Sequence, residues 1–222
     1  MNTAFLDTNI IISWIFLINS LHPKSVDVFK SYSQFFWSSS VVKELEKKFN
    51  VKSKNLIRFF LDLQKFLENP EKDLYSISDL IDFANEHCSK QLLDEVKSSV
   101  KPFWSEYLGI QSRIPFFDMK NAIDFCLNDL LLNLDINKRG IEEIMQLSPQ
   151  RNNDYSQIDA MLESLGVDEE DRKIILDGHD FACFSTQPVD FVTFDDDCFN
   201  GAKNLDFLCF NSVKGKYDFT AS

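Results

Sequence analysis

The chain has 222 residues and a mass of 25.8 kDa, a length that allows one large domain or two small ones. Hydrophobic residues make up 44% of the sequence, enough for a packed core, so wholesale disorder is excluded. The net charge of −12 argues against a protein that coats nucleic acids through a basic face, but it is compatible with an enzyme that holds phosphates through metal ions.

The negative charge is concentrated in one segment. Residues 168–197 hold ten acidic side chains against Arg172 and Lys173, so this segment carries a charge of −8 out of the total of −12. Two explanations are open. The carboxylates either cap helices and face solvent, or some of them surround a cation.

The cysteines and the first residues indicate the compartment. The five cysteines are odd in number and form no closely spaced pair, which predicts neither a disulfide framework nor a structural zinc site and favours a reducing cytoplasm. The segment from Met1 to Ala4 lacks the basic start of a signal peptide. The longest apolar stretch, residues 10–18, is too short to cross a bilayer, so we expect a buried helix there and no membrane partner.

Short apolar runs at both ends of the chain predict the strands of a parallel sheet. Residues 3–6 form a run that stops at the polar corner 7–9 and leads directly into an apolar helix, the pattern of a βα unit. Residues 34–37 form a second run, followed by three serines that can cap a helix over 41–49. Residues 189–193 and 206–210 predict two further strands, and residues 213–222 are expected to be irregular.

The middle of the chain has a helical pattern. Between residues 55 and 165, apolar side chains recur at helical spacing, as in 56–67, 77–84 and 123–131, and no strand pattern interrupts them. We therefore predict an α/β fold with two parts. Residues 1–54 and 166–222 form the sheet domain, and residues 55–165 form a long all-helical insertion packed on it.

Acidic residues follow two of the predicted strands. Asp7 comes directly after the first strand, and the run from Asp195 to Asp197 comes after the strand at 189–193. Ligands of open α/β sheets bind at the carboxyl ends of strands, and carboxylates crowded there are tolerable around a cation. The alternatives are an aspartate that caps the following helix and an exposed acidic turn.

Two further acidic residues are predicted near the same strand ends. Glu44 lies in the first helical turns after the second strand, although a solvated helix face is the alternative. Asp168 is a good N-cap for another helix, and Asp171 in the first turn of that helix shares a side with small and apolar residues. Asp177 and Asp180 point elsewhere around this helix, and Asp180 is expected to be a solvated charge.

Four segments, in this order, resemble the PIN domain family of metal-dependent nucleases. They are Phe5-Leu6-Asp7-Thr8-Asn9-Ile10, Ser40-Val41-Val42-Lys43-Glu44-Leu45, Asp171 followed by Ile174-Ile175-Leu176, and Phe191-Val192-Thr193-Phe194-Asp195-Asp196-Asp197. The first and last are the more specific. The resemblance covers about the first 50 and the last 55 residues, just under half of the chain. The helical insertion has no counterpart in the short members of the family, which are typically toxins of toxin–antitoxin pairs.

The resemblance implies a three-layer α/β/α domain with a central parallel sheet that hydrolyses RNA phosphodiester bonds with one or two Mg²⁺ or Mn²⁺ ions. Carried over position by position, it implies catalytic and metal-binding carboxylates at Asp7, Glu44, Asp171 and Asp195, with Asp197 as an auxiliary metal ligand. It also implies that Thr8, Asn9 and Thr193 hydrogen-bond these carboxylates in place. Asp177 and Asp180 are the alternatives for the third acidic position, where helix geometry favours Asp171.

The residue types agree with this chemistry. Hard divalent cations prefer carboxylate oxygens, and His179 is expected on the far face of its helix, so a metal-activated water is the economical nucleophile. The densest basic run follows Glu44 directly, and it either guides an RNA backbone towards the site or forms a solvated helix face. This run consists of Lys43, Lys47, Lys48, Lys52, Lys54 and Arg58.

Several alternatives to an isolated nuclease are open. A PIN-like domain without catalysis would act as a binding scaffold, although all four acidic positions are filled here. A haloacid-dehalogenase-like phosphotransferase also begins with a strand and an aspartate, but it needs a second aspartate where this chain has Asn9. A toxin would bind an antitoxin or another protein, and the insertion could serve RNA recognition or homodimer formation.

Overall fold

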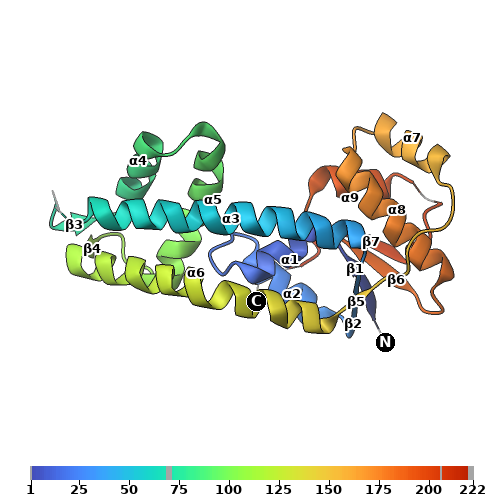
Figure 1. The fold of residues 1–222 in the computed structure, drawn as a ribbon, viewed down its shortest axis with the longest axis horizontal. Helices are drawn as coiled ribbons and strands as arrows, with labels where there is room; N and C mark the ends of the chain where they lie inside the picture. The colour runs from blue at the N-terminus through green and yellow to red at the C-terminus, as the bar shows by residue number, and fades with distance from the viewer. Residues whose placement is uncertain (1, 69–71, 206, 220–222) are drawn as a thin grey trace. The chain divides into compact units, whose positions relative to one another are not determined.

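The structure, a computed structural model, describes residues 2–68, 72–205 and 207–219 (Figure 1). The strands are β1 Thr3–Leu6, β2 Gln34–Trp37, β3 Leu74–Tyr75, β4 Ile114–Pro115, β5 Met145–Leu147, β6 Val189–Val192 and β7 Ser212–Lys214. The helices are α1 Thr8–Ile15, α2 His22–Ser31, α3 Ser39–Phe66, α4 Ile77–His87, α5 Lys90–Tyr107, α6 Phe116–Ile144, α7 Ser156–Ser164, α8 Glu169–Phe184 and α9 Asp196–Lys203.

The chain divides into two compact units. The first, here called the sheet unit, comprises Met1–Trp14, Pro23–Lys47 and Gly140–Ser222. The second, the helical unit, comprises Ile15–His22 and Lys48–Arg139. These divisions differ from the predicted ones at 54/55 and 165/166, because α3 and α6 are continuous helices and the sequence from 140 onwards contributes a strand to the sheet.

A five-stranded sheet forms the centre of the sheet unit. Its strand order is β5-β2-β1-β6-β7, and all four strand pairs are parallel. Phe5 in the central strand pairs with Phe36 of β2 on one side and with Phe191 of β6 on the other. The predicted α/β class with a central parallel sheet is therefore confirmed.

Helices pack against both faces of this sheet. On one face, the ring of Phe181 from α8 lies 4.4 Å from that of Phe36 and 6.1 Å from that of Phe5, measured between ring centroids. Successive strand residues point to opposite faces, and Phe35 accordingly lies 4.9 Å from Phe29 of α2 on the other face. Burial on both sides explains why the inner strands β1, β2 and β6 consist mainly of apolar residues.

Some predicted elements are wrong. Met145–Leu147, inside the segment predicted to be entirely helical, is a strand that pairs with β2, with Phe36 opposite Gln146. The described residues of the predicted strand 206–210, which are 207–210, are not a strand, whereas Ser212–Lys214 in the supposedly irregular tail pairs with β6. Both strands have three residues, too few for an apolar pattern, and their pairing with a neighbouring strand defines them.

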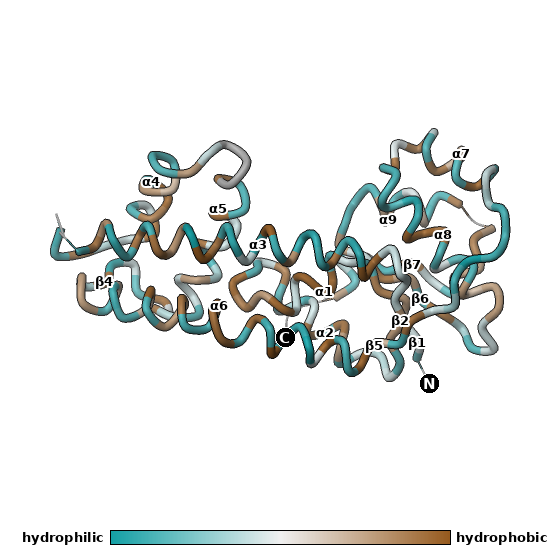
Figure 2. The backbone as a smooth tube through the Cα atoms, viewed as in Figure 1, coloured by the Kyte–Doolittle hydropathy of each residue, from teal (hydrophilic) through white to brown (hydrophobic). Residues whose placement is uncertain are grey.

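The helical unit has its own aromatic core. Phe60 of α3 and Phe103 of α5 have ring centroids 4.9 Å apart, and Phe59 lies 6.0 Å from Phe83 of α4. Apolar and polar residues recur at helical spacing along α3, which gives it an apolar side and a polar side (Figure 2). Because the sequence from 39 to 66 contains no glycine or proline, the helix does not end near residue 49 as predicted.

Gly201 in α9 is closely packed within the sheet unit. A Cβ atom at this position would lie 2.2 Å from Cγ2 of Val167, in the segment that precedes α8. We expect Gly201→Ala to lower the free energy of unfolding by about 1–3 kcal/mol, because this clash outweighs the helix propensity of alanine. Chemical denaturation measures the change. Gly140→Ala in α6 is the matched control, since its Cβ would meet nothing within 4 Å. The control should be at least as stable as the wild type, and equal stability of the two variants would contradict the packing described here.

Candidate active site

The carboxyl ends of three adjacent strands meet at one edge of the sheet. Asp7 follows β1, Ser38 follows β2 and Thr193 follows β6. From β1, the chain adds β2 and β5 on one side and β6 and β7 on the other, so the strand order reverses between β1 and β6. Open α/β sheets bind ligands at such a reversal, outside the carboxyl ends of the strands.

The carboxylate of Asp7 is held in one orientation. Its side chain is almost fully buried, with 1% of its surface exposed. Oδ1 accepts a hydrogen bond from the backbone N–H of Thr8 at 2.6 Å, and Oδ2 accepts one from the hydroxyl of Thr193 at 2.7 Å. These two donors come from α1 and from the end of β6, so the reversal point of the sheet itself orients the carboxylate.

Glu44 belongs to the same network. It lies in the second turn of α3 and is 8% exposed, and its Oε2 accepts a hydrogen bond from the hydroxyl of Thr8 at 2.5 Å. Thr8 therefore links the carboxylates of Asp7 and Glu44, one through its backbone amide and the other through its hydroxyl.

Asp195 is placed by the turn between β6 and α9. Its backbone N–H donates to Oγ1 of Thr193 at 3.0 Å, so the hydroxyl that contacts Asp7 also fixes this turn. Asp195 is the N-cap of α9, and its Oδ1 accepts from the amides of Asp197 and Cys198, both at 2.9 Å. Only one of its two carboxylate oxygens takes part in these capping bonds.

Asp171 faces the other acidic residues from the first turn of α8. Asp168 caps this helix as predicted, accepting a hydrogen bond from the amide of Asp171 at 2.9 Å. Burial, and then the negative charges of Asp7, Asp168, Asp195 and Glu44, raises the pKa of Asp171 to about 8. These interactions bring together the four residues Asp7, Glu44, Asp171 and Asp195, which we call the acidic cluster.

The remaining predicted acidic candidates lie outside this network. The side chain of Asp197 is exposed in the first turn of α9. Asp177 accepts a hydrogen bond from the hydroxyl of Ser40 at 2.7 Å and lies 3.7 Å from Nε of Arg151. Asp180 was expected to be solvated, and this is wrong, because it is 7% exposed and accepts hydrogen bonds from the segment at 153–155. Asn9 lies half-buried in the first turn of α1.

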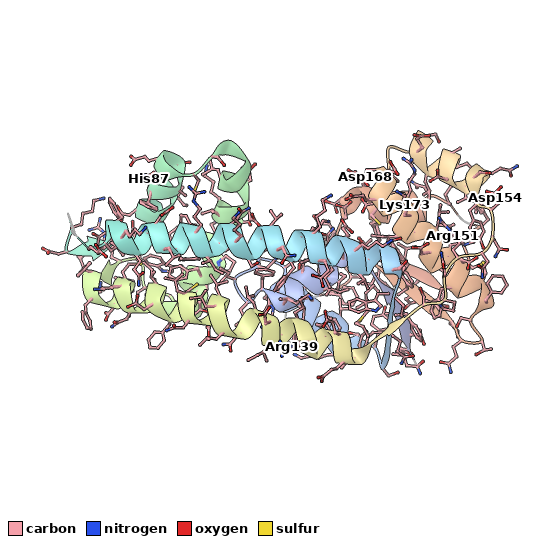
Figure 3. All side chains as sticks on the ribbon, in the orientation of Figure 1. His87, Arg139, Arg151, Asp154, Asp168 and Lys173 are labelled. Atoms are coloured by element: carbon pink, nitrogen blue, oxygen red, sulfur yellow. A yellow bond between two sulfur atoms is a disulfide. The ribbon has the colours of Figure 1, made fainter. Side chains whose placement is uncertain are left out.

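The predicted basic run divides between the two units. Lys43 and Lys47 lie in the sheet unit and line a cleft of about 360 Å³ beside Glu44. A third lysine, Lys173 of α8 (labelled in Figure 3), also lines this cleft. The sequence did not single it out. The other members, Lys48, Lys52, Lys54 and Arg58, belong to the helical unit.

Lys52 and Arg58 of this basic run form ion pairs within the helical unit. Lys52 lies 3.6 Å from Glu95, and burial lowers the pKa of its amine. Arg58 lies 3.8 Å from Asp62 on the exposed side of α3. Within the sheet unit, Lys47 itself pairs with Glu170 at 3.0 Å across the cleft.

Sequence reasoning missed one buried group, the thiol of Cys198. It has no exposed surface, and burial followed by the negative charges of Asp7 and Asp171 raises its pKa well above the usual value. The signal in the sequence was its position three residues after the capping Asp195, on the apolar side of α9. A neutral thiol therefore lies next to the acidic cluster.

The donor set of the acidic cluster fits a hard divalent cation. Its donors are carboxylate oxygens, and the backbone amide of Thr8 and the hydroxyls of Thr8 and Thr193 orient the carboxylates of Asp7 and Glu44. Among the described residues, no three carboxylates have oxygens within 4.8 Å of one another. Within these residues no site is therefore preformed in which three carboxylates coordinate one ion, whereas Mg²⁺ commonly takes one or two protein carboxylates and completes its shell with water.

The prediction that the cysteines form no disulfide is wrong. Cys183 at the end of α8 and Cys209 before β7 are bonded, with Cα atoms 5.2 Å apart and a sequence separation of 26. His179, expected on the far face of its helix, contacts Cys209, whose backbone N–H donates to its Nδ1 at 3.0 Å. It is 5% exposed and packs against the ring of Tyr155 at 5.0 Å. Spacing rules for closely placed cysteines do not detect this pair, because β6 and α9 bring its members together.

Comparison with models of protein families, with curated proteins and with solved structures finds no match in any of the three. The resemblance to PIN domains therefore rests on the residues of this chain alone. Across the part of the chain that the structure describes, none of the helices has the length and the apolar composition that a bilayer crossing requires.

Asp171→Asn is expected to stabilise the protein when divalent cations are absent. The unfolded state releases the proton of Asp171 near pH 4, whereas the folded state keeps it up to about pH 8. The wild type therefore loses stability over this pH range and the variant does not. One pKa unit corresponds to about 1.4 kcal/mol, so we expect a gain in unfolding free energy of at least about 2 kcal/mol at pH 8. Denaturation in EDTA at pH 4 and pH 8 measures it, and a gain independent of pH would contradict the clustering of charges.

Proposed function

We propose that the protein is a divalent-metal-dependent ribonuclease with a PIN-like sheet domain, which hydrolyses phosphodiester bonds in RNA. The observation that supports it most directly is the hydrogen-bond chain from Glu44 through Thr8, Asp7 and Thr193 to Asp195. This chain links residues from three segments that resemble the family, and it lies at the edge of the sheet where ligands of such folds bind.

The proposed division of labour follows from these contacts. A bound Mg²⁺ or Mn²⁺ ion would activate a water molecule for in-line attack and neutralise the leaving oxygen. Asp7 and Asp195 would hold the ion from the ends of β1 and β6, while Glu44 and Asp171 approach it from α3 and α8. Thr8 and Thr193 donate to the carboxylates and keep them from turning away.

The lysines beside Glu44 indicate where RNA would lie. Lys43, Lys47 and Lys173 line the cleft that opens next to this carboxylate, and they supply the positive charge that a phosphate backbone requires. Glu170 pairs with Lys47 and lowers the positive charge of this surface. RNA binding should therefore weaken strongly as the salt concentration rises.

The proposed setting is the cytoplasm, with RNA as the substrate. A toxin role, which would add an antitoxin as a protein partner, is the biological context that the short members of the resembled family suggest. Expression should then slow growth, and harmless expression would argue against this role.

The test of the proposed function is cleavage of single-stranded and structured RNA by the purified protein. We expect cleavage with Mn²⁺ or Mg²⁺ and none after EDTA treatment, with activity restored by adding the ion back. Binding of RNA without cleavage at any divalent ion concentration would replace the nuclease by a binding scaffold.

A further inference from the structure

A group of potential metal ligands lies apart from the acidic cluster. His179 and Cys183 are four residues apart and therefore share one face of α8, and Cys209 reaches them from the segment before β7. One ligand atom from each of the three lies within 4.8 Å of the others. His179 is buried and both cysteines are exposed, so an ion or a small reductant can reach the sulfur atoms from solvent.

The distances are close to those of a tetrahedral zinc site. Sγ of Cys183 lies 3.8 Å from Nδ1 and 3.7 Å from Nε2 of His179. With Zn–S near 2.3 Å and Zn–N near 2.0 Å, tetrahedral coordination places sulfur and nitrogen about 3.6 Å apart. The helix thus presents a sulfur and an imidazole within reach of one ion, with Sγ almost equally far from the two ring nitrogens. Coordination requires the ring to rotate as the S–S bond opens, so that one nitrogen lone pair points at the ion.

The imidazole of His179 is held in the form that a metal requires. Its Nδ1 accepts a hydrogen bond from the backbone N–H of Cys209 at 3.0 Å, so this nitrogen carries a lone pair and the proton lies on Nε2. Burial lowers the pKa of the ring, which keeps it neutral, although the nearby charge of Asp180 acts in the opposite direction. Tyr155 and Phe210 pack edge-on against the ring and fix its plane.

We propose that His179, Cys183 and Cys209 form a redox-gated Zn²⁺ site, which binds the ion when the two thiols are reduced and releases it when the disulfide forms. A thiol reductant supplies two electrons and two protons, which break the S–S bond and leave two cysteine thiols. Zn²⁺ then binds both sulfurs as thiolates and releases two protons to solvent. The lone pair on Nδ1 turns from the amide of Cys209 to the ion, and water takes the fourth position. In the reverse direction a small disulfide accepts two electrons from the thiolates and, with two protons, leaves as two thiols, while the S–S bond of the protein forms again and Zn²⁺ is released.

The two states exclude each other for two reasons. In the oxidised state the two sulfurs share one electron pair in the S–S bond and carry no negative charge, so they are weak metal ligands, and the lone pair of Nδ1 is occupied by the amide of Cys209. The ligand set also selects the ion, since thiolate and imidazole favour Zn²⁺ over the hard cations suited to the acidic cluster. Cys88, Cys126 and Cys198 are free thiols, as expected in a reducing compartment, where a lone exposed disulfide is open to thiol exchange.

Metal titration of the full chain in its reduced and oxidised forms tests the proposal. Co²⁺ is the spectroscopic probe, because thiolate ligation gives an intense sulfur-to-metal charge-transfer band in the near ultraviolet, and Zn²⁺ then competes it away. We expect one equivalent of tight Zn²⁺ binding in the reduced protein and none in the disulfide form. Cys183→Ser and Cys209→Ser should each weaken Zn²⁺ binding at least 100-fold, whereas Cys88→Ser should leave it unchanged.

Asp7→Asn separates this site from the proposed nuclease centre. The variant should keep the Co²⁺ band and the Zn²⁺ affinity, whatever its effect on RNA cleavage. Equal Zn²⁺ affinity of the reduced wild type and Cys183→Ser, or equal affinity of the reduced and oxidised forms, would overturn the proposal and leave a purely structural disulfide.

Discussion

Asp7→Asn is expected to lower the rate of Mn²⁺-dependent RNA cleavage about 10³-fold, a loss of about 4 kcal/mol in transition-state stabilisation. The carboxylate of Asp7 is the most deeply buried of the acidic cluster, and both of its oxygens accept hydrogen bonds. Asparagine keeps its shape and one acceptor oxygen, and the hydroxyl of Thr193 can turn to accept from the new amide. The fold should therefore survive while the negative charge of the proposed metal ligand is lost. Steady-state cleavage rates and thermal unfolding of both proteins measure these two effects.

Asp196→Asn is the matched control for this substitution. Asp196 lies in the neighbouring acidic turn, but its side chain is 61% exposed and pairs with Lys216. Its removal changes the net charge by the same amount and should alter the cleavage rate less than about 3-fold, in line with the small contribution of exposed pairs. Equal losses in the two variants would mean that bulk negative charge, and not the orientation of Asp7, supports activity.

Cys183→Ser should lower the free energy of unfolding by about 3 kcal/mol when measured with a chelator and without reductant. The disulfide joins residues 26 apart, and the loop that it closes contains β6, Thr193 and α9. Without the bond, the unfolded chain gains the conformational freedom of this loop. Denaturant titration gives the change, and the wild type in excess reductant should match the variant.

Cys88→Ser serves as the control for thiol replacement. Cys88 is a free, half-buried cysteine at the end of α4 in the helical unit. Its substitution should change stability by less than about 0.5 kcal/mol, as for most surface positions. If the reductant left the wild type as stable as before, the Cys183–Cys209 bond would contribute nothing to the folded state.

The acidic cluster shows how far motif reasoning reaches. The positions of Asp7 and Asp195 follow from the chain alone, because an aspartate directly after a buried apolar run must lie at the end of a strand. The sequence also placed Asp171 on the inner side of α8, since helical periodicity fixes which residues share a face. The hydrogen bond between Thr8 and Glu44, 36 residues apart, required the packing of α3 beside α1.

Lys173 and Asp180 show the opposite case. Both lie on α8; the sequence did not single out Lys173, and for Asp180 a solvated charge was the expectation. Lys173 nevertheless joins Lys43 and Lys47 at one cleft, and Asp180 is buried under Asn153 and Tyr155. The neighbours that decide these environments come from distant parts of the chain, and the local pattern contains no information about them.

The sequence by itself determined the elements whose residues carry their own signal. These are the apolar inner strands β1, β2 and β6, the serines that open α3, and the capped start of α8. Only the tertiary structure decided β5, β7 and the Cys183–Cys209 bond. A three-residue edge strand exists because a neighbouring strand offers hydrogen-bond partners, and a disulfide exists because the fold brings two sulfurs together. The concentration of acidic residues at 168–197 was visible from the start, but the fold divides it into members of the acidic cluster, helix caps and surface charges.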